Sequence, residues 1–595
     1  MRGDTAQVLT IFSPEVLLSL LLCFFVLRRY YLARRSANNC SDHGRRLPPS
    51  PPKLPLIGHL HLVGPDPHIS LAELSRKHAG RDGLMLLRLG QVPNLVVSSP
   101  SAAEAVLRTH DHVFASRPPS IVAGVLLSGP SDVALTPYGE YWRQARKLVT
   151  THLLSARKVR ALQGGREEEV RLVVAKLRAA AAARSAVDMT ELLGGFTNDV
   201  VCRAVSGKFF REEGRNELFR ELIAGNVAAI GGFNLEDYFP SLAKVGLLRR
   251  VVLGKTRRLK KRWDELLDKI IDDHATKSPW LVGVHQHQPN EQEQNQQDED
   301  RDLVDVLLSL QHEYNLTRGN VKAILLDMFS AGTDTSSIVL EFAMAELMRK
   351  PHLMAKLQAD VRSKTPKTQQ TVKEDDLGNM SYLKAVVKET LRPAIVRCFA
   401  MAELRRKPHL MAKLQADVRS KTPKTQQTVK EDDLGNMSYL KAVVKETLRL
   451  PPPAPLLLPH LSMAECDDVN GYMVPAGTRV IINAWALCRD TESWGMKAEE
   501  FWPERFMDGA KAAADFKGRD FQFLPFGAGR RICPGMGFGL ATVEAMLANL
   551  VYCFDWELPD GMREEDVDMA DVFGVTMRRK EKLVLVPRIP QDANI

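Results

Sequence analysis

The chain has 595 residues, of which 45% are apolar, and a formal net charge of +9, so it can bury a large core. Its eight cysteines occur singly, without the paired spacing of a zinc site or the density of a disulfide framework, which favours a reducing environment. Basic residues are spread along the chain, which excludes a nucleic-acid-binding signature. A basic face for an anionic membrane or an acidic redox partner stays open.

The N-terminus predicts a membrane anchor. Val8–Leu27 is nearly all apolar and about long enough to span a bilayer, and four arginines follow it at positions 28, 29, 34 and 35. No small-residue cleavage site closes this stretch, so we expect a retained signal anchor within residues 1–35 rather than a removed signal peptide. The arginines should stay cytosolic; a buried core helix is the alternative. The prolines of 47–58 predict a stiff, extended spacer at the end of a hinge over residues 36–58.

The body, residues 59–595, alternates helical patterns with short β-rich runs such as Met85–Leu89 and Asn94–Ser98. A helix over Tyr141–Leu153 would place Trp142 and Arg146 on one face, because they are four residues apart. Residues 284–302 are rich in Asn, Gln and acidic residues and lack apolar residues that could pack, which predicts a disordered loop. Two histidines in this loop, at 285 and 287, are poor candidates for a metal site.

One long helix is predicted over Lys322–Leu347, and it contains AGTDTS at 331–336. Small residues at 331 and 332 would let a flat cofactor or bound dioxygen lie against this helix. The neighbouring threonine and serine hydroxyls can donate to carbonyls one turn earlier, which opens the helix locally. Ser and Thr clusters often do no more than satisfy themselves in this way, and that is the alternative.

The chain contains a duplication. Residues 338–392 recur as 395–449, and only positions 340, 341 and 348 differ from their counterparts. Repeat folds need several stacked copies, so two near-identical copies indicate a recent tandem duplication or an error in the gene structure. Without 57 residues the chain would have 538. We expect the spare copy to be displaced and to lower stability, since it would expose a second apolar helix.

Two hairpins are predicted after the repeats. Gly471–Val480 has β-branched residues around a Pro/Gly turn, and the stretch from Asp571 to Pro587 reads as a second hairpin whose turn should enter a binding pocket.

Between these hairpins lies FGAGRRICPG, at 526–535, followed by an apolar run that predicts a buried helix over Met536–Leu550. Cys533 would stand just before the helix N-terminus, where the N–H groups and the helix dipole favour a thiolate. A structural cysteine in a turn is the alternative. The loop matches FxxGxRxCxG through Phe526, Gly529, Arg531, Cys533 and Gly535, so the chain resembles the cytochromes P-450, in which this loop carries the haem ligand.

The resemblance implies a mainly α fold with small β-sheets, a haem b cofactor, and a thiolate ligand that favours O–O cleavage. It also implies site residues in three groups. The cofactor-binding residues would be Trp142, Arg146, His460, Phe526, Arg531 and the iron ligand Cys533; the residues delivering protons to bound oxygen would be Asp334 and Thr335; and a buried charge network would join Glu446, Arg449 and Arg505. Glu389 and Arg392 duplicate the first two members, but only the second copy runs on into the segment that ends at His460.

The motifs are most similar to family 71 of the plant microsomal enzymes, within it the grass enzymes that hydroxylate indole and its oxidised products. The resemblance implies a monooxygenase on the endoplasmic reticulum membrane, with a cytosolic catalytic domain. Its partners would be O2, a small hydrophobic substrate and NADPH-cytochrome P-450 reductase, since this chain has no dinucleotide fingerprint. By analogy, residues 121–130, 226–234, 454–458 and the 571–576 turn would line a mostly apolar pocket. Terpenoid or phenylpropanoid substrates, a non-oxidative isomerase or dehydratase, and an inactive duplicate remain alternatives.

Overall fold

The computed structural model describes most of the body of the chain. The described residues are 46–277 except 128, 130, 208–209, 211–213, 233 and 242–245; 301–349, 351, 354–355 and 358; 454–496 and 498; and 517–589 except 564–565 and 569–570. The predicted anchor, His285 and His287, both KETLR segments and Arg505 lie outside this part of the chain.

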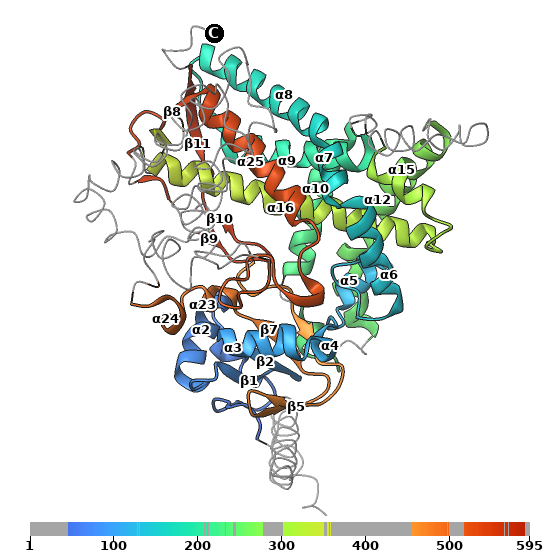
Figure 1. The fold of residues 1–595 in the computed structure, drawn as a ribbon, viewed down its shortest axis with the longest axis vertical. Coiled ribbons are helices and arrows are strands. Elements are labelled where there is room, and N and C mark those ends of the chain that lie inside the picture. The colour runs from blue at the N-terminus through green and yellow to red at the C-terminus, as the bar shows by residue number, and fades with distance from the viewer. Residues whose placement is uncertain are drawn as a thin grey trace, which may run out of the picture.

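The fold is mainly α with small β-sheets, as the sequence predicts (Figure 1). Its longer helices are α2 (Pro67–His78), α6 (Glu140–Leu148), α8 (Gln163–Ala182), α9 (Met189–Ser206), α10 (Arg215–Gly231), α12 (Gly246–Lys277), α16 (Arg318–Arg349) and α25 (Met536–Cys553). The shorter helices are α3 (Pro100–Glu104), α4 (Asp111–Phe114), α5 (Ile121–Leu126), α7 (Ala156–Ala161), α11 (Leu235–Tyr238), α15 (Leu303–Ser309), α23 (Ala484–Leu487) and α24 (Thr491–Trp494).

Helix α16 runs through the centre of the helical part and packs against α9 and α25 (Figure 1). Its residues Ile324, Leu325 and Phe329 are fully buried, and each such side chain stabilises the fold by roughly 1.5–3 kcal/mol. Helix α9 comes close because position 332 is glycine. A Cβ there would lie 2.9 Å from Val201 Cγ2. Among the described residues α16 is also the one helix long and apolar enough to cross a membrane, and 56% of its most apolar stretch is buried in the fold.

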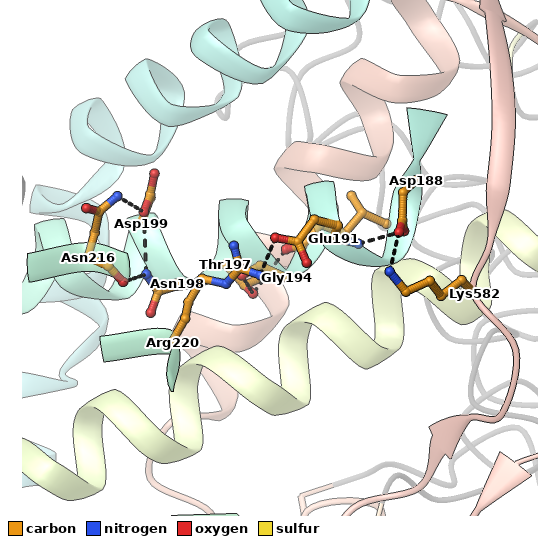
Figure 2. Close-up of polar contacts among 10 residues, drawn as sticks. Asp188, Glu191, Gly194, Thr197, Asn198, Asp199, Asn216, Arg220 and Lys582 are labelled. Carbon is orange, nitrogen blue, oxygen red and sulfur yellow. Dashed lines mark hydrogen bonds and ion pairs between the residues drawn. The ribbon is translucent and has the colours of Figure 1, made fainter. Parts of the chain in front are cut away.

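Polar contacts at the N-terminal end and along the side of α9 fix this helix in place (Figure 2). Asp188 caps its N-terminus by accepting from the Glu191 N–H at 3.0 Å, and it also accepts from Lys582 Nζ at 2.7 Å. Further along, Asn198 Nδ2 donates to the Asn216 carbonyl at 2.9 Å. These contacts tie α9 to the C-terminal strands and to α10, so the partner of α16 has little freedom to shift.

The main sheet has the strand order β1-β2-β7-β4 and lies beside α2, α3 and α23 at the other end of the molecule (Figure 1). Strands β1 (Leu84–Leu89) and β2 (Val92–Val97) are antiparallel and confirm the two predicted β-rich runs. Strand β7 (Arg479–Ile482) then pairs in parallel with β2, and β4 (His460–Leu461) pairs with β7. This order brings residue 460 beside the first strands of the body.

The first predicted hairpin is wrong in its pairing. Strand β6 (Tyr472–Val474) pairs with β5 (Cys466–Val469) instead of with β7. The turn lies at Asn470–Gly471, where both residues have positive φ, 52° and 78°. An Asn-Gly pair suits the tight turn of a two-residue hairpin better than the later Pro/Gly sequence does. The second hairpin is confirmed, since β9 (Asp571–Val572) pairs with β10 (Arg578–Arg579). Strand β11 (Val584–Arg588) instead joins β3 (Val187–Asp188) and β8 (Asp555–Glu557).

Two predicted boundaries also change. The end of the proline-rich hinge packs on the body: the Leu86 N–H donates to the Pro49 carbonyl at 2.8 Å, and Gly58 bridges to Leu89. The spacer prediction is therefore wrong from residue 46 onward, because backbone pairing holds this segment on the sheet. At the end of the predicted polar loop, Asp302 is ordered and caps α15 by accepting from the Asp305 N–H at 2.9 Å.

Candidate active site

The loop before α25 is held in shape by a glycine that no other residue could replace. Gly529 has φ of +64°, and a Cβ there would lie 2.3 Å from the Leu107 carbonyl oxygen. The Cys533 N–H donates to the Phe526 carbonyl at 3.0 Å, which closes the loop, and α25 begins at Met536. The structure therefore confirms that Cys533 stands immediately before the N-terminus of a long helix.

The electrostatics of Cys533 differ from the prediction. Burial raises the pKa of the thiol above its usual value, although the N–H groups of Gly535 and Met536 and the nearby Arg146 lower it. The side chain keeps exposed surface, but the surrounding protein is dense enough for desolvation to prevail. The expected preference for a free thiolate is thus wrong for the cysteine by itself. A coordinated metal ion would remove the proton outright.

Arg531 is held by backbone carbonyls on one side and an aromatic ring on the other. Its Nε donates to Ala115 at 2.7 Å, Nη1 to Val133 at 3.2 Å, and Nη2 to Thr136 at 2.6 Å. The guanidinium carbon lies 4.1 Å from the centre of the Trp142 ring. Three of its five N–H groups are used in these contacts, so the guanidinium retains donors for an anion.

Trp142 and Arg146 come from one face of α6, as predicted, and both reach the cysteine loop. The Trp142 ring is buried and its Nε1 donates to the Val133 carbonyl at 2.9 Å, the same carbonyl that Arg531 contacts. Arg146 Nη2 donates to the carbonyl of Ile532, the residue before the cysteine. The π-helical turn Val149–Leu153 continues this segment, which gives the predicted helix an irregular second half.

His460 lies on the same side of the molecule, where β4 meets the segment after α4. Its Nδ1 contacts the Phe114 carbonyl at 2.8 Å, so Nδ1 carries the proton when the ring is neutral. Burial, with a smaller effect of Arg117 and Arg531, lowers the pKa of His460 to about 3. The imidazole is therefore neutral at physiological pH.

Sequence reasoning missed Arg117, which no motif marks. It is 5% exposed, and it donates through Nε to the Ala134 carbonyl at 3.0 Å and through Nη1 to the Leu458 carbonyl at 2.6 Å. Burial and then the like charge of Arg531 lower the pKa of Arg117 to about 9. Burial likewise lowers the pKa of Arg531 to about 10, with a further effect of Arg146.

This cluster fits the carboxylates of haem. Three guanidiniums, those of Arg117, Arg146 and Arg531, lie close together: besides burial, Arg531 and Arg146 lower the pKa of Arg117, Arg146 lowers that of Arg531, and a neutral His460 lies beside them. Gathering like charges in a partly buried space is unfavourable unless anions balance them. The two propionates of haem would supply that charge, and the thiol of Cys533 is an appropriate iron ligand next to Arg146.

A second group of polar residues lies on α16. Thr335 Oγ1 donates to the Ala331 carbonyl at 2.8 Å, which confirms the predicted bond to the preceding turn. Asp334 accepts from Thr576 Oγ1 at 2.7 Å and pairs with Arg578 Nη2 at 2.5 Å, both from the β9–β10 hairpin. Of the two small residues, Ala331 is exposed, whereas Gly332 faces α9. From the sequence we expect both small residues to leave room for a cofactor, and this expectation is wrong for Gly332.

The remaining predicted site residues lie elsewhere. Phe526 is half-buried at the start of the loop, and Glu446, Arg449 and Arg505 lie outside the described residues.

A cysteine in a loop before a long helix, a cluster of cationic donors and an acid–alcohol pair on a central helix are together the features expected of a haem-thiolate oxygenase. The cytochrome P450 family matches residues 48–395 and 394–586, and the chain belongs to this family. The two matches meet at residues 394–395, where the second copy of the repeat begins, in agreement with a duplication. The protein is a cytochrome P450 monooxygenase with haem b as its cofactor.

Two similar proteins and one solved structure show what the chain resembles within this family. It is 50% identical over 580 residues to indole-2-monooxygenase of Zea mays, covering 96% of this chain and 94% of that protein. It is 48% identical to indolin-2-one monooxygenase of Zea mays, with 97% and 96% covered. A zebra fish cytochrome P450 structure with progesterone matches with a TM-score of 0.62 at 22% identity, over 88% of this chain and 99% of that one, and so shows the shared fold.

Proposed function

We propose that the protein hydroxylates an indole-type substrate. The observation that carries this proposal is the identity of about half of all residues, over nearly the full length, to enzymes named for oxidising indole and indolin-2-one. The alternative of a terpenoid substrate has less support, since premnaspirodiene oxygenase of Hyoscyamus muticus is 38% identical.

In this proposal Cys533 ligates the haem iron, and Arg146 and Arg531 bind the propionates. Trp142 supports Arg531 through its ring, since its Nε1–H donates to the Val133 carbonyl. His460 binds a propionate by taking up a proton at Nε2, since its Nδ1–H donates to the Phe114 carbonyl. Bound haem supplies the activation of dioxygen, which a thiolate ligand assists. The contacts of Arg531 with three carbonyls support its role, because they fix the direction of its remaining N–H groups. Glu446, Arg449 and Arg505 are proposed to form the charge network that the family resemblance implies.

Asp334 and Thr335 are proposed to move protons toward the oxygen site. The Thr335 hydroxyl is half-buried on α16, and its neighbour Asp334 accepts hydrogen bonds from the hairpin that follows β9. A carboxyl group that takes up a proton from solvent and passes it to a hydroxyl, while the hydroxyl donates its own proton onward, provides general acid catalysis by a positioned pair. Keeping both groups also speaks against the isomerase or dehydratase alternative.

The pocket is proposed to lie where this hairpin meets α10. A Cβ at Gly231 would be 3.0 Å from Val575 Cγ2, so the hairpin turn approaches the end of α10 closely. Val575 and the 226–234 segment are mostly apolar, which suits a flat aromatic substrate oriented by few polar contacts. Electrons are proposed to come from NADPH-cytochrome P-450 reductase, at the endoplasmic reticulum membrane to which residues 1–35 would anchor the chain.

The test combines binding and turnover. Purified protein is reconstituted with haem, NADPH and a plant reductase, and indole, indolin-2-one and a terpene panel are titrated for a spin-state shift. We expect a shift and an 18O-labelled product with an indole-type compound under 18O2, and neither with Cys533→Ala. Turnover of terpenes alone would overturn the substrate assignment, and product formation without NADPH would favour the isomerase alternative.

A further inference from the structure

The loop of residues 131–136 provides three of the carbonyl groups that hold the cationic cluster. The Val133 carbonyl accepts from Trp142 Nε1 and from Arg531 Nη1. The Thr136 carbonyl accepts from Arg531 Nη2, and the Ala134 carbonyl accepts from Arg117 Nε. A shift of this loop would therefore move Arg531, Arg117 and Trp142 together.

Two buried carboxyl groups hold this loop through its N–H groups. Asp327 of α16 accepts at Oδ2 from the N–H of Val133 at 2.7 Å and of Ala134 at 3.2 Å. Within the loop, Asp132 accepts from the Leu135 N–H at 2.7 Å and from Thr136 Oγ1 at 2.6 Å. Each of the three loop carbonyls thus belongs to a residue, Val133, Ala134 or Thr136, that donates a hydrogen bond to one of these two carboxyl groups.

The two carboxyl groups interact with each other, and both are buried, Asp132 at 0% and Asp327 at 9% exposure. Burial, and then the Asp132 carboxylate, raise the pKa of Asp327 well above its usual range. The other groups that face the pair are Tyr141 of α6, whose pKa burial raises to about 12, and the guanidiniums of Arg117 and Arg531 near Asp132. Burial and the neighbouring Asp132 carboxyl thus both favour the neutral form of Asp327, because two adjacent buried carboxylates repel.

We propose that Asp327 and Asp132 form a positioning pair, which fixes the 131–136 loop through its N–H groups and, through the loop, the groups that face the haem propionates. Neither residue touches the reacting atoms; they act through the loop backbone. The proposal rests on the proposed roles of Arg531 and Trp142 at the haem, and it adds the groups that set their positions.

The test compares Asp327→Asn with Asp327→Ala in the full-length chain. Asparagine keeps an oxygen for the two N–H groups and an NH2 group that donates to Asp132, so it reproduces the neutral acid. Alanine leaves the Val133 and Ala134 N–H groups and Asp132 without their partner. The control is Glu341→Ala, a buried acid on the same helix whose partners are Thr190 at 2.8 Å and Arg579 at 3.3 Å, away from the loop.

Hydrogen–deuterium exchange of residues 131–138 and the rate of haem transfer to apomyoglobin are the readouts. We expect Asp327→Ala to raise both by about tenfold or more, since a buried donor is left unsatisfied. Asp327→Asn should keep both rates within about twofold of the wild type, because its amide oxygen still accepts from the two N–H groups. Glu341→Ala should leave both near the wild-type values even if it lowers the melting temperature.

The pH dependence gives a second readout. A carboxyl whose folded pKa is raised contributes most stability below its unfolded value near 3.8, and this contribution falls as pH rises toward the folded pKa. Asparagine cannot ionise. The melting temperature of Asp327→Asn relative to the wild type should therefore increase from pH 4 to pH 8.

Three results would overturn the proposal: unchanged exchange of the loop in Asp327→Ala, equal effects of Asp327→Ala and Glu341→Ala, or a pH-independent difference for Asp327→Asn. Loop exchange and the pH profile do not depend on haem. These two measurements therefore test the role of the Asp327–Asp132 pair even if the wild type lacks a thiolate-haem spectrum. The lack of that spectrum would instead contradict the proposed role of Cys533.

Discussion

Arg531 and Asp334 both carry charge and a proposed role at the haem, but they are held in different ways. Arg531 donates to three backbone carbonyls and stacks on a buried ring. Asp334 is held by two side chains, Thr576 and Arg578, and Arg578 is 42% exposed. Backbone carbonyls cannot rotate away from a partner, whereas side chains can. The comparison suggests a fixed cofactor side and an adjustable proton-delivery side.

The largest expected effect comes from removing the sulfur on the fixed side. Cys533→Ser should abolish the thiolate signature of the reduced carbon-monoxide spectrum and all turnover, because no other described cysteine lies in the loop. The spectrum of purified protein, normalised to haem content, measures this. A native thiolate band in the variant would contradict the assignment of the ligand.

A matched pair of arginine variants tests the comparison directly. Arg531→Gln should weaken haem retention by about tenfold or more, since removing one partner of a buried polar network leaves the others unsatisfied. Arg578→Gln should leave haem retention unchanged. Haem transfer to apomyoglobin measures both, and equal losses would show that the two sides are not held differently.

On the adjustable side, Asp334→Asn and Thr335→Val should lower turnover by about 10²-fold, the range typical of a lost acid or base. Haem content and the carbon-monoxide spectrum should remain those of the wild type, and more NADPH should be consumed per product formed. Arg578→Gln removes one of the two partners of Asp334 and should raise the NADPH consumed per product by a smaller factor. Haem loss in Thr335→Val would place that residue on the cofactor side instead.

Removal of one repeat should have a moderate effect on stability. Deleting residues 350–406 joins Arg349 to Lys407, keeps α16 intact and leaves one KETLR segment. We expect the melting temperature to rise by roughly 1 °C for each kcal/mol gained, because the entropy of unfolding grows with chain length. Equal melting of both proteins, together with a native spectrum for the full chain, would contradict a destabilising spare copy.

The smallest expected effect lies far from both sides. His274 is fully buried; burial lowers its pKa, but the hydrogen bond and charge of Asp302, 2.9 Å from Nε2, raise it more, so the net pKa lies above 6.5. Its contribution is complete below pH 6.5 and is lost as pH rises through the folded pKa. The melting-temperature difference between wild type and His274→Gln should shrink from pH 6 to pH 9. A melting-temperature difference that grows over this pH range would contradict a raised pKa for His274 in the folded protein.

The sequence predicts those parts of the site that depend on local patterns. The cysteine loop, α25, α16 and strands β1 and β2 follow from glycine positions and apolar periodicity, and the structure agrees. The π-helical turn after α6 and the pairing of the first hairpin could not be predicted from these local patterns. In the hairpin, the sequence offers two turns only a few residues apart, and pairing with β2 decides which is used.

The contacts that hold the cationic cluster could not be predicted from the sequence. Arg117, Arg531 and Trp142 donate to main-chain carbonyls, and every residue has a carbonyl, so no residue type marks the partner. Arg578 contacts Asp334 across 244 positions, which a local pattern does not encode. Asp132 and Asp327 are individually ordinary acids, and only the fold brings them together.

The first copy of the repeat is partly built into the core. Met354 is 7% exposed, and Gln358 Nε2 donates to the Phe554 carbonyl at 2.7 Å, so both residues are part of the core. Their counterparts in the second copy, Met411 and Gln415, are of the same residue types, so the second copy offers the same side chains for these contacts. The two copies therefore compete for one binding surface, and the loss of stability that we expect comes from this competition.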